Sequence, residues 1–366
     1  MGLALATKHT ALLLPLGLGA HYLVLGVIAG LRAPASARGT ARALAVARTA
    51  ISHRWRVIVS LAVLGPLTLY AVWPWLWFDP VHHVRDWLAF HLHHVHYNYE
   101  YLGRNWNAPP FPWHVALVTT LVTVPASTLA AAVAGAGVWI ARCTRPMPRV
   151  RHAPALLLAL SAAASIGPFF LGTTPIFGAE KHWMPILPTI CIAAGVGAVW
   201  AARQAARWVP ERVAIDAVAG AIAVAAAVET QVAEPYALTW YSALAGGAPG
   251  GAELGMNRQF WGVAMRGALP RLAAEARSNG PTYVYTHDAS PAWRLYQEEG
   301  LVPRSLLDAG WEQGGIDRSD LAVVIHELHF NRHDYLIWNT YGTVQPIYVL
   351  TSDGVPIVSI YRRPAR

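Results

Sequence analysis

The sequence predicts an α-helical polytopic membrane bundle of about six transmembrane helices, followed by a small α/β domain. Charged residues make up 13% of the 366 residues, where a soluble domain has about 25%, and hydrophobic residues make up 55%. The charge is also unevenly divided: residues 1–232 hold 17 basic and 7 acidic side chains, whereas residues 233–366 hold 11 and 13. This composition excludes a chain made of two ordinary soluble domains.

The first 232 residues contain six apolar runs that are long enough for a spanning helix, which needs about 20 residues. The runs are Thr10–Leu31, Trp55–Phe78, Trp113–Ala141, Ala153–Gly172, Trp183–Ala202 and Val213–Val232. Tryptophans at the ends of several runs are typical of the membrane–water interface. We therefore expect a transmembrane bundle over residues 1–232, with loops at 79–112 and 173–182.

The basic residues between the runs predict the orientation of the bundle. Thirteen arginines lie in three connections, namely Arg32, Arg38, Arg42, Arg48, Arg54, Arg56, Arg142, Arg145, Arg149, Arg151, Arg203, Arg207 and Arg212. The loops 79–112 and 173–182 hold only Arg85, Arg104 and Lys181. Because basic loops stay cytoplasmic, we expect these two loops and the C-terminal domain to be extracytoplasmic (periplasmic), on the outer side of the inner (plasma) membrane.

The same asymmetry explains the net charge of +8, since the excess of basic residues lies in the apolar part of the chain. A basic membrane half is what the positive-inside rule produces, whereas a nucleic-acid-binding protein concentrates its positive charge on a polar surface. We therefore expect no nucleic-acid partner.

The beginning of the chain has two interpretations. Lys8, the apolar run after it and Ala35-Ser36-Ala37 resemble a signal peptide with its cleavage site. However, the run is longer than the usual stretch of about 7–15 residues, and export would place most arginines of the first basic loop outside. We favour a chain that begins within a larger membrane domain.

Residues 233–366 predict a connector followed by a small domain. Within residues 233–254, the Gly-rich segment Gly246–Gly251 lacks the glycine patterns of nucleotide-binding loops and is expected as a flexible connector. Residues 255–366 are expected to form the α/β domain. Its expected strands are Thr282–Thr286, Leu321–His326, Ile347–Leu350 and Val355–Tyr361, the last two joined by a hairpin at Asp353-Gly354, and its expected helices are Gln259–Ala276, Pro291–Glu299 and His333–Tyr341.

The loop 79–112 combines histidines with an apolar stripe that runs from Val81 to Tyr99 at spacings of three to four residues. This pattern predicts an amphipathic helix at the membrane interface. Imidazole and guanidinium groups are donors for an anionic phosphate, and the candidate substrate-binding residues of this loop are Arg85, His91, His94 and Arg104.

Two other interpretations of this loop stay open. His82, Asp86 and His93 share one flank of the expected helix, and histidine with carboxylate at this spacing can bind a metal ion. Alternatively, the histidines are interface residues that form hydrogen bonds with headgroups or neighbours. Nothing in the sequence selects a particular metal, so neither a metal nor a cofactor is expected.

The loop 173–182 ends in Glu180, Lys181 and His182, and Pro185 and Pro188 follow in the next apolar run. Prolines interrupt the helical hydrogen-bond ladder, which is tolerated at membrane depth mainly where the backbone lines protein or a wet cavity. Ionisable groups beside such a break are therefore candidates for substrate binding. The alternative is a Lys181 side chain that extends to the interface and pairs with Glu180.

In the C-terminal domain, His326-Glu327-Leu328-His329 resembles a metalloprotease motif only superficially. Its two histidines are three residues apart at the end of a strand, whereas the protease motif places them four apart on a helix. The acids and bases of this domain form no recognisable triad, metal set or phosphate loop. We therefore expect a scaffold or acceptor-facing module without catalysis of its own.

Several segments together resemble the later half of bacterial integral-membrane glycosyltransferases related to the protein O-mannosyltransferase and aminoarabinose transferase group. These segments are Gly2–Lys8, Trp73–Trp77, Phe90–Tyr97, Pro109–Pro112 and Phe177–Pro185, and the resemblance continues through Gly246–Trp261 and His326–Tyr361. The order of the segments carries the resemblance, rather than any one motif.

This resemblance implies a GT-C fold enzyme of the cell envelope. Such enzymes move a sugar from a polyprenyl-phosphate carrier to an acceptor at the external face, with inversion and usually without a metal. The acceptor can be a lipid, a glycan or a protein. In the family, the carboxylate that activates the acceptor precedes the segment matched by Gly2–Lys8, so no catalytic residue can be assigned here. Three interpretations stay open: a fragment, a split gene product that works with a separate chain supplying the N-terminal half, or a misassigned start.

Two further classes of function stay open from the residues alone. A membrane transporter could use Glu180, Lys181 and His182 as a gate, although the proline-interrupted runs show no duplication in two related halves. A histidine-rich metal-binding membrane protein could use the loop 79–112. The resemblance favours the glycosyltransferase.

Overall fold

The computed structural model describes residues 1–31, 39–51, 55–143, 153–176, 178–287 and 290–364. The chain divides into two compact units, and each is described by itself. Unit 1 comprises Met1–Tyr97, Ala108–Leu117 and Thr128–Ile222, and unit 2 comprises Asn98–Asn107, Val118–Ser127 and Ala223–Arg366. Outside the described residues lie Arg32, Ala35-Ser36-Ala37, Arg38, Arg54, Arg145, Arg149, Arg151 and Phe177.

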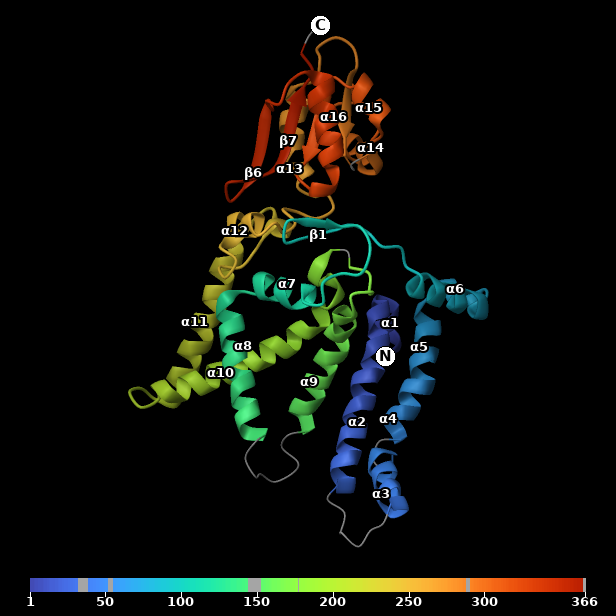
Figure 1. Ribbon diagram of the computed structural model, residues 1–366, viewed down its shortest axis with the longest axis vertical. Coiled ribbons are helices and arrows are strands. Elements are labelled where there is room, and N and C mark those ends of the chain that lie inside the picture. Colours follow the sequence, from blue (N-terminus) through green and yellow to red (C-terminus); the bar gives the residue numbers. More distant parts are fainter. Residues whose placement is uncertain (32–38, 52–54, 144–152, 177, 288–289, 365–366) are drawn as a thin grey trace. The chain divides into compact units, whose positions relative to one another are not determined.

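The first 231 residues are mostly helical (Figure 1). The α-helices are α1 (Gly2–Thr7), α2 (Leu14–Leu31), α3 (Gly39–Ile51), α4 (Trp55–Val59), α5 (Gly65–Val72), α6 (Pro80–Leu92), α7 (Val115–Thr123), α8 (Ala126–Cys143), α9 (Ala153–Ile166), α10 (Leu187–Ala205) and α11 (Glu211–Gln231). Short 3₁₀ segments are η1 (His9–Leu13), η3 (Pro74–Trp77), η4 (Gly167–Leu171), η5 (Ala179–His182) and η6 (Met184–Ile186), and η2 (Ser60–Leu64) is a π-helical turn.

Five helical stretches of the described chain are long and apolar enough to cross a membrane. They are His9–Ile28, Trp55–Val72, Pro154–Leu171, Met184–Ala205 and Glu211–Gln231. Each coincides with one of the six runs expected from the sequence. By length and composition, the prediction of membrane-spanning helices is confirmed at these five positions.

The third expected span, Trp113–Ala141, is not one straight helix. It is broken between α7 and α8, whose axes are bent by 120°. Pro125 lies at the break, where it has no backbone N–H to donate and disfavours a helical conformation at Val124. The Glu229 carboxylate accepts a hydrogen bond from the Ala126 N–H at 3.0 Å and so caps the first turn of α8.

The prolines of the expected fifth span have a milder effect than a break. Pro185 lies in the 3₁₀ segment η6, and Pro188 lies in the first turn of α10. Proline is well tolerated in a first turn, because the N–H that it lacks would have no partner within the helix. The span therefore enters as a 3₁₀ turn and continues as a regular helix.

Helices α8 and α10 of unit 1 pack through small residues. A Cβ atom added to Gly135 of α8 would lie 1.9 Å from the Ala193 carbonyl oxygen of α10. A Cβ atom added to Gly197 would lie 2.0 Å from the Ala131 carbonyl oxygen. Each helix thus presents an alanine and a glycine four residues apart, the small-residue spacing that lets apolar helices approach closely.

Unit 2 contains a two-stranded hairpin and a five-stranded sheet. The hairpin is β1 (Tyr99–Tyr101) with β2 (Arg104–Trp106). The sheet has the order β4-β3-β5-β7-β6. Its strands are β3 (Thr282–Thr286), β4 (Leu306–Asp308), β5 (Leu321–Ile325), β6 (Tyr348–Ser352) and β7 (Val355–Arg362). Strand β3 runs parallel to β4 and β5, whereas β7 runs antiparallel to β5 and β6.

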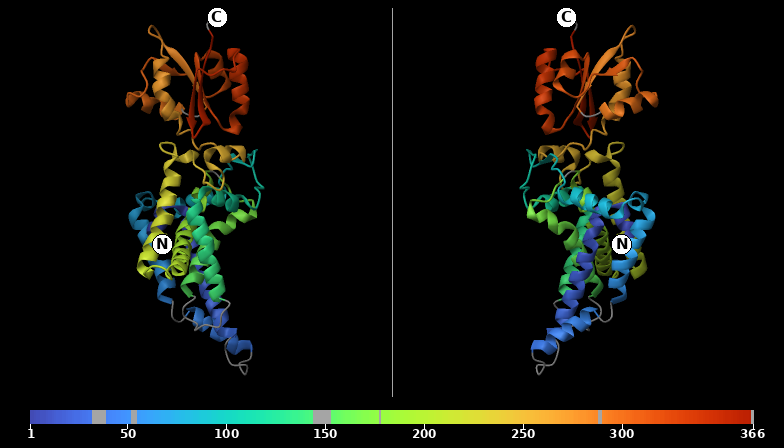
Figure 2. Two further views of the ribbon diagram at one scale, coloured as in Figure 1. Left: turned by 90° about the vertical axis from the view of Figure 1, so that its left-hand side faces the viewer. Right: turned by 90° about the vertical axis from the view of Figure 1, so that its right-hand side faces the viewer.

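Helices cover both faces of this sheet (Figure 2). The helices of this part are α12 (Gly247–Glu253), α13 (Met265–Ala274), α14 (Ser290–Glu298), α15 (Gln313–Arg318) and α16 (Asn331–Tyr341), with 3₁₀ segments η7 (Ala237–Thr239) and η8 (Leu328–Phe330). On one face, Leu269 and Trp293 of α13 and α14 pack on Val284, and on the other, Ile316 and Ile337 of α15 and α16 pack with Tyr285. The adjacent residues Val284 and Tyr285 point to opposite faces, as the period of a strand requires.

The strands and helices expected for this domain are confirmed within a few residues, except that the expected helix Gln259–Ala276 begins only at Met265. The hairpin between β6 and β7 turns at Asp353 and Gly354, both with positive φ, as the Asp-Gly sequence predicts. Three elements were not expected: the short edge strand β4, the helix α15 and the hairpin β1–β2. The Gly-rich segment, expected as a flexible connector, forms helix α12 from Gly247.

Candidate functional site

A group of basic side chains in unit 1, here called the basic cluster, consists of Lys8, His9, His91 and Lys181. Lys8 follows α1, His9 begins η1, His91 lies on α6 and Lys181 lies in η5. The Lys8 Nζ donates a hydrogen bond to the backbone carbonyl of Lys181. The His9 and His91 rings stack with centroids 3.9 Å apart. The fold thus joins two predicted residues, His91 and Lys181, with two that the sequence analysis did not select.

The basic cluster is electrostatically unfavourable for its own cations. Partial burial lowers the pKa of Lys8, and the charge of Lys181 lowers it further. Partial burial also lowers the pKa of His91, with a smaller contribution from His94. Among the described residues, no carboxylate lies within ion-pair distance of Lys8, His9 or His91. An anion bound here would relieve the repulsion.

Glu180 and His182 flank Lys181 in η5. The His182 ring is buried, with its centroid 5.9 Å from that of Phe169. Burial raises the pKa of the Glu180 carboxyl, and a backbone hydrogen bond opposes this effect. Its Oε2 atom is buried without a hydrogen-bond partner in the part of the chain that the structure describes. The turn therefore places a desolvated acid next to the basic cluster.

The other predicted binding residues are Arg85, His94 and Arg104. Arg85 is exposed on α6, and His94 follows that helix, with its Nδ1 2.7 Å from the Val95 carbonyl oxygen. Arg104 is exposed on strand β2 of unit 2, with its guanidinium 4.1 Å from the Trp106 ring centroid. His91 and Lys181 are therefore the predicted residues that unit 1 brings into one cluster, and Arg104 belongs to unit 2.

The expected interfacial helix is shorter than its apolar stripe. Helix α6 begins at Pro80, where Asp79 Oδ1 accepts a hydrogen bond from the His82 N–H at 3.1 Å, and it ends at Leu92. Beyond it the chain turns into strand β1, so Tyr99 is on a strand rather than on the helix. Val81 and Leu92 are 80% and 77% exposed, an apolar surface that suits a membrane interface.

The suggested metal flank of α6 is realised in part. The His82 Nε2 lies 3.2 Å from Asp86 Oδ2, one helical turn away, and both side chains are exposed. His93 ends the helix, and its Nδ1 lies 3.1 Å from the Ala89 carbonyl oxygen. Among the described residues, no group of three potential metal ligands includes a residue of α6.

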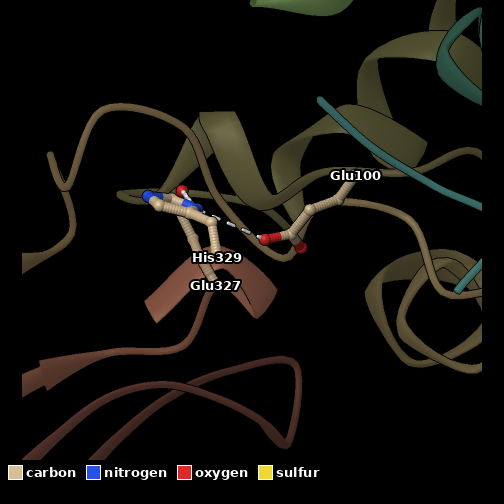
Figure 3. Close-up of side chains that lie close together, drawn as sticks. All are labelled: Glu100, Glu327 and His329. Atoms are coloured by element: carbon tan, nitrogen blue, oxygen red, sulfur yellow. Dashed lines mark ion pairs between the residues drawn. The ribbon is translucent and has the colours of Figure 1, made fainter. Parts of the chain in front are cut away.

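Unit 2 contains a second group, here called the carboxylate–histidine cluster, made of Glu100, Glu327 and His329 (Figure 3). The His329 Nδ1 lies 3.4 Å from Glu327 Oε2 and 3.6 Å from Glu100 Oε1. The side chains of Glu100 and Glu327 are 3% and 8% exposed. The three potential ligand atoms lie within 4.8 Å of one another.

The topology of the sheet explains why these residues meet. Strands β4 and β5 lie on opposite sides of β3, and all three are parallel. The strand order therefore reverses at β3, and the switch point lies between β3 and β5. In open α/β sheets, such a switch point leaves a crevice at the carboxyl ends of the strands. Glu327 and His329 follow the carboxyl end of β5. Glu327 borders a cavity of about 200 Å³ that Glu100 and Arg258 also line.

The hairpin β1–β2 brings Glu100 to this crevice. The Glu100 N–H donates to Asn257 Oδ1 at 2.9 Å, and the Gly103 N–H donates to the Gly255 carbonyl oxygen at 2.8 Å. The Glu100 carboxylate in turn accepts a hydrogen bond from the Leu328 N–H, between the other two members of the cluster. Glu100 is thus held by hydrogen bonds to two segments, the one that contains Gly255 and Asn257 and the one that contains Leu328.

A buried histidine–aspartate pair lies at the same ends of the strands. His287 follows β3, and its Nε2 lies 3.2 Å from Asp334 Oδ1 of α16. The Ile325 N–H donates to His287 Nδ1 at 3.0 Å, so Nδ1 carries a lone pair and the proton of a neutral ring is on Nε2. The Phe330 ring stacks on this imidazole at 4.2 Å.

Sequence patterns did not reveal these two groups, because their members are far apart in the chain. Glu100 precedes Glu327 by more than 200 residues, and the hairpin that carries it has only three residues in each strand. The available signal was positional: polar residues directly after buried parallel strands gather at one edge of a sheet. The motif His326–His329 is such a segment, although it is not a metalloprotease helix.

Comparisons of the chain with protein-family models, with curated proteins and with solved structures find no match.

Proposed function

We propose that this chain is the donor-binding part of a bacterial integral-membrane glycosyltransferase of the GT-C type. In this proposal it moves a sugar from a polyprenyl-phosphate carrier to a lipid, glycan or protein acceptor. The transfer takes place at the extracytoplasmic face of the inner membrane, where the C-terminal domain also lies. The basic cluster is the observation that carries the proposal, and the resemblance of the sequence segments names the reaction.

In this proposal, the basic cluster lies at the depth of a lipid phosphate. Lys8 immediately precedes the candidate span His9–Ile28, and Lys181 lies three residues before the candidate span Met184–Ala205. A polyprenyl chain within the bilayer presents its phosphate at the level of the headgroups, where the ends of spanning helices lie. Ammonium and imidazole groups gathered there are suitable donors to phosphate oxygens.

The charge of the cluster also suits the chemistry of transfer. In the donor, the phosphate links the sugar to the polyprenyl chain as a diester with one negative charge. When the bond between the sugar and the phosphate oxygen breaks, its electron pair stays on the phosphate, which gains a second charge. Ammonium and imidazole donors beside the phosphate stabilise the doubly charged leaving group more than the bound donor, and this difference lowers the barrier.

Lys8→Ala and Lys181→Ala are expected to weaken the binding of undecaprenyl phosphate by the full-length protein in nanodiscs. Loss of one charge-assisted hydrogen bond costs about 1.5–3 kcal/mol, which corresponds to about ten- to a hundredfold in affinity. The matched control is Arg42→Ala, an exposed cation on α3, which should bind with wild-type affinity. Uncharged undecaprenol serves as the neutral ligand.

Equal affinity of the wild-type protein for the phosphate and the alcohol would refute the basic cluster as the donor site. Wild-type affinity in both lysine variants would do the same. Sugar transfer itself is measured in membrane vesicles of the source cell, with a labelled sugar on the polyprenyl phosphate. Unchanged consumption of this donor after deletion of the gene would contradict the proposed reaction.

A further inference from the structure

The carboxylate–histidine cluster of unit 2 has the residue types and the convergence of a metal site. Two carboxylates and one imidazole come from two segments that are far apart in the sequence, the hairpin β1–β2 and the η8 turn. Their side chains converge, and their potential ligand atoms lie within 4.8 Å of one another (Figure 3). This group is separate from the basic cluster, which belongs to unit 1.

The distances within the cluster suit one shared ion. Oxygen and nitrogen ligands bind Zn²⁺ at about 2.0–2.2 Å, so two ligands of a tetrahedral ion lie about 3.3–3.6 Å apart. The His329 Nδ1 lies 3.4 Å from the Glu327 carboxylate and 3.6 Å from the Glu100 carboxylate. Both distances from the imidazole are therefore those of ligands that share one ion.

The contact between Asn98 and His329 is compatible with a metal ion at Nδ1. The Asn98 amide nitrogen lies 3.0 Å from His329 Nδ1, and an amide NH₂ group can only donate, so Nδ1 presents a lone pair. A half-turn of the Asn98 amide would place its carbonyl oxygen at the same point. Asn98 could then supply a fourth ligand.

The burial of Glu100 adds an electrostatic argument. A buried carboxylate is costly unless it is hydrogen-bonded and its charge is compensated. Among the described residues, the ionisable group that pairs with the Glu100 side chain is His329, at 3.6 Å. Arg258 borders the same cavity. A divalent cation between the carboxylates would supply the charge at the point where they converge.

We propose that Glu100, Glu327 and His329 bind a divalent transition-metal ion, with Zn²⁺ as the best match to two carboxylates and one imidazole. The site has no thiolate, which separates it from sites for Cu(I) or iron–sulfur clusters, and its imidazole disfavours Ca²⁺ and Mg²⁺, which prefer oxygen ligands alone. The ion ties the hairpin β1–β2 to the η8 turn and closes one side of the crevice. This role is structural and does not depend on the proposed donor site.

The test is a metal titration of the full-length protein in detergent, after treatment with a chelator. The wild-type protein should bind one equivalent of Zn²⁺ and unfold at a higher temperature with the metal than without it. Glu327→Gln and His329→Gln should weaken this binding by more than the about 10–100-fold that is typical of a lost outer-shell partner. Glu312→Gln, an exposed acid of the same unit, is the matched control.

The histidine-rich helix α6 is the competing site, and His82→Ala separates the two. Loss of the bound equivalent in His82→Ala, with wild-type binding in Glu327→Gln, would move the metal to α6 and overturn the proposal. Tighter binding of Ca²⁺ or Mg²⁺ than of Zn²⁺, or no bound metal at micromolar Zn²⁺, would overturn it as well.

A variant that gains a spectroscopic signal distinguishes loss of a ligand from misfolding, because a misfolded protein would not produce the signal. His329→Cys, in a Cys143→Ala/Cys191→Ala background, keeps a ligand at this position but changes its chemistry. When this protein is loaded with Co²⁺, a thiolate-to-cobalt charge-transfer band should appear, because the sulfur bonds directly to the ion. A folded His329→Cys protein that binds Co²⁺ without this band would exclude His329 as a ligand.

Discussion

The interiors of the two units are packed with side chains of different size. In unit 1, α8 and α10 approach so closely that a Cβ atom at Gly135 or Gly197 would collide with the backbone of the opposite helix. In unit 2, large side chains such as Leu269 and Trp293 fill the space between the helices and the sheet. Burial of large apolar side chains stabilises a structure in water but not between helices in lipid, where close contact of small residues replaces it.

The two clusters of polar side chains also differ, in the sign of the charge that surrounds their histidines. The basic cluster gathers cations, and no carboxylate of the described chain pairs with Lys8 or His91. The carboxylate–histidine cluster places its one histidine, His329, beside two acids. The first arrangement favours an anionic ligand and the second favours a cation. The histidines of the two clusters therefore have opposite kinds of neighbour.

The largest expected effect is that of Gly197→Leu. The added side chain must displace the Ala131 backbone, which a Cβ atom alone would approach to 2.0 Å, so the two helices have to separate. Overpacking in a rigid interior costs about 1–3 kcal/mol and more where the backbone cannot move. We expect loss of monodisperse protein after extraction into detergent, measured by size-exclusion chromatography.

The matched control lies two residues earlier on the same helix. Gly195 is exposed, and a Cβ atom added there meets nothing within 4 Å. Gly195→Leu should therefore elute like the wild-type protein. If both leucine variants behave alike, the close approach of α8 and α10 does not hold unit 1 together, and the contrast with unit 2 disappears.

This packing also shows what the sequence could predict and what it could not. Length and hydropathy identified the spans, because each span must cross the same thickness of lipid. They did not identify the break at Pro125, although the proline was a signal for it. Hydropathy averages over an apolar run and does not show whether the helix changes direction within that run. Which spans pack together depends on pairs such as Gly135 with Ala193, and hydropathy does not distinguish one small residue from another.

The sheet of unit 2 was easier to predict than its sites. Each strand from Thr282 onward except β4 has its own apolar pattern and turn, so local sequence is sufficient. The candidate sites join residues far apart in the chain, as Lys8 with Lys181 or Glu100 with His329. Local sequence patterns indicated Lys181 and His91 as candidates. They could not show that Lys8 and His9 would lie beside them.

An intermediate effect is expected for Leu269→Ala in unit 2. Leu269 is 1% exposed on α13, and removal of a buried leucine side chain costs about 2–5 kcal/mol. The loss should appear as reduced hydrogen-exchange protection of β5 and β7 in the full-length protein. The control is Leu295→Ala on α14, where the side chain is 56% exposed, and this variant should keep wild-type protection. Equal losses in both variants would mean that this core does not stabilise unit 2.

The smallest expected effect is a dependence of the stability of unit 2 on pH through His326. Burial lowers the pKa of His326, Arg258 and His287 lower it further, and Asp334 opposes them. Because an unfolded histidine has a pKa of about 6.5, the unfolded state binds the proton more tightly than the folded state does. Stability is therefore highest above about pH 6.5 and falls as the pH decreases from there towards the lowered pKa of the folded state.

His326→Gln should flatten this fall, because a glutamine amide can replace the hydrogen bond that links His326 Nε2 to Ser359 Oγ at 2.9 Å but does not titrate. The measurement is the protection factor of the β5 amides at pH 7.5 and 5.5, corrected for intrinsic exchange, with His96→Gln, an exposed position, as the control. The flattening should be partial, since burial also lowers the pKa of His333 on the neighbouring helix. A double variant, His326→Gln/His333→Gln, should flatten it further. If the double variant loses protection between the two pH values as steeply as the wild-type protein, the acid sensitivity of unit 2 comes from groups other than these histidines.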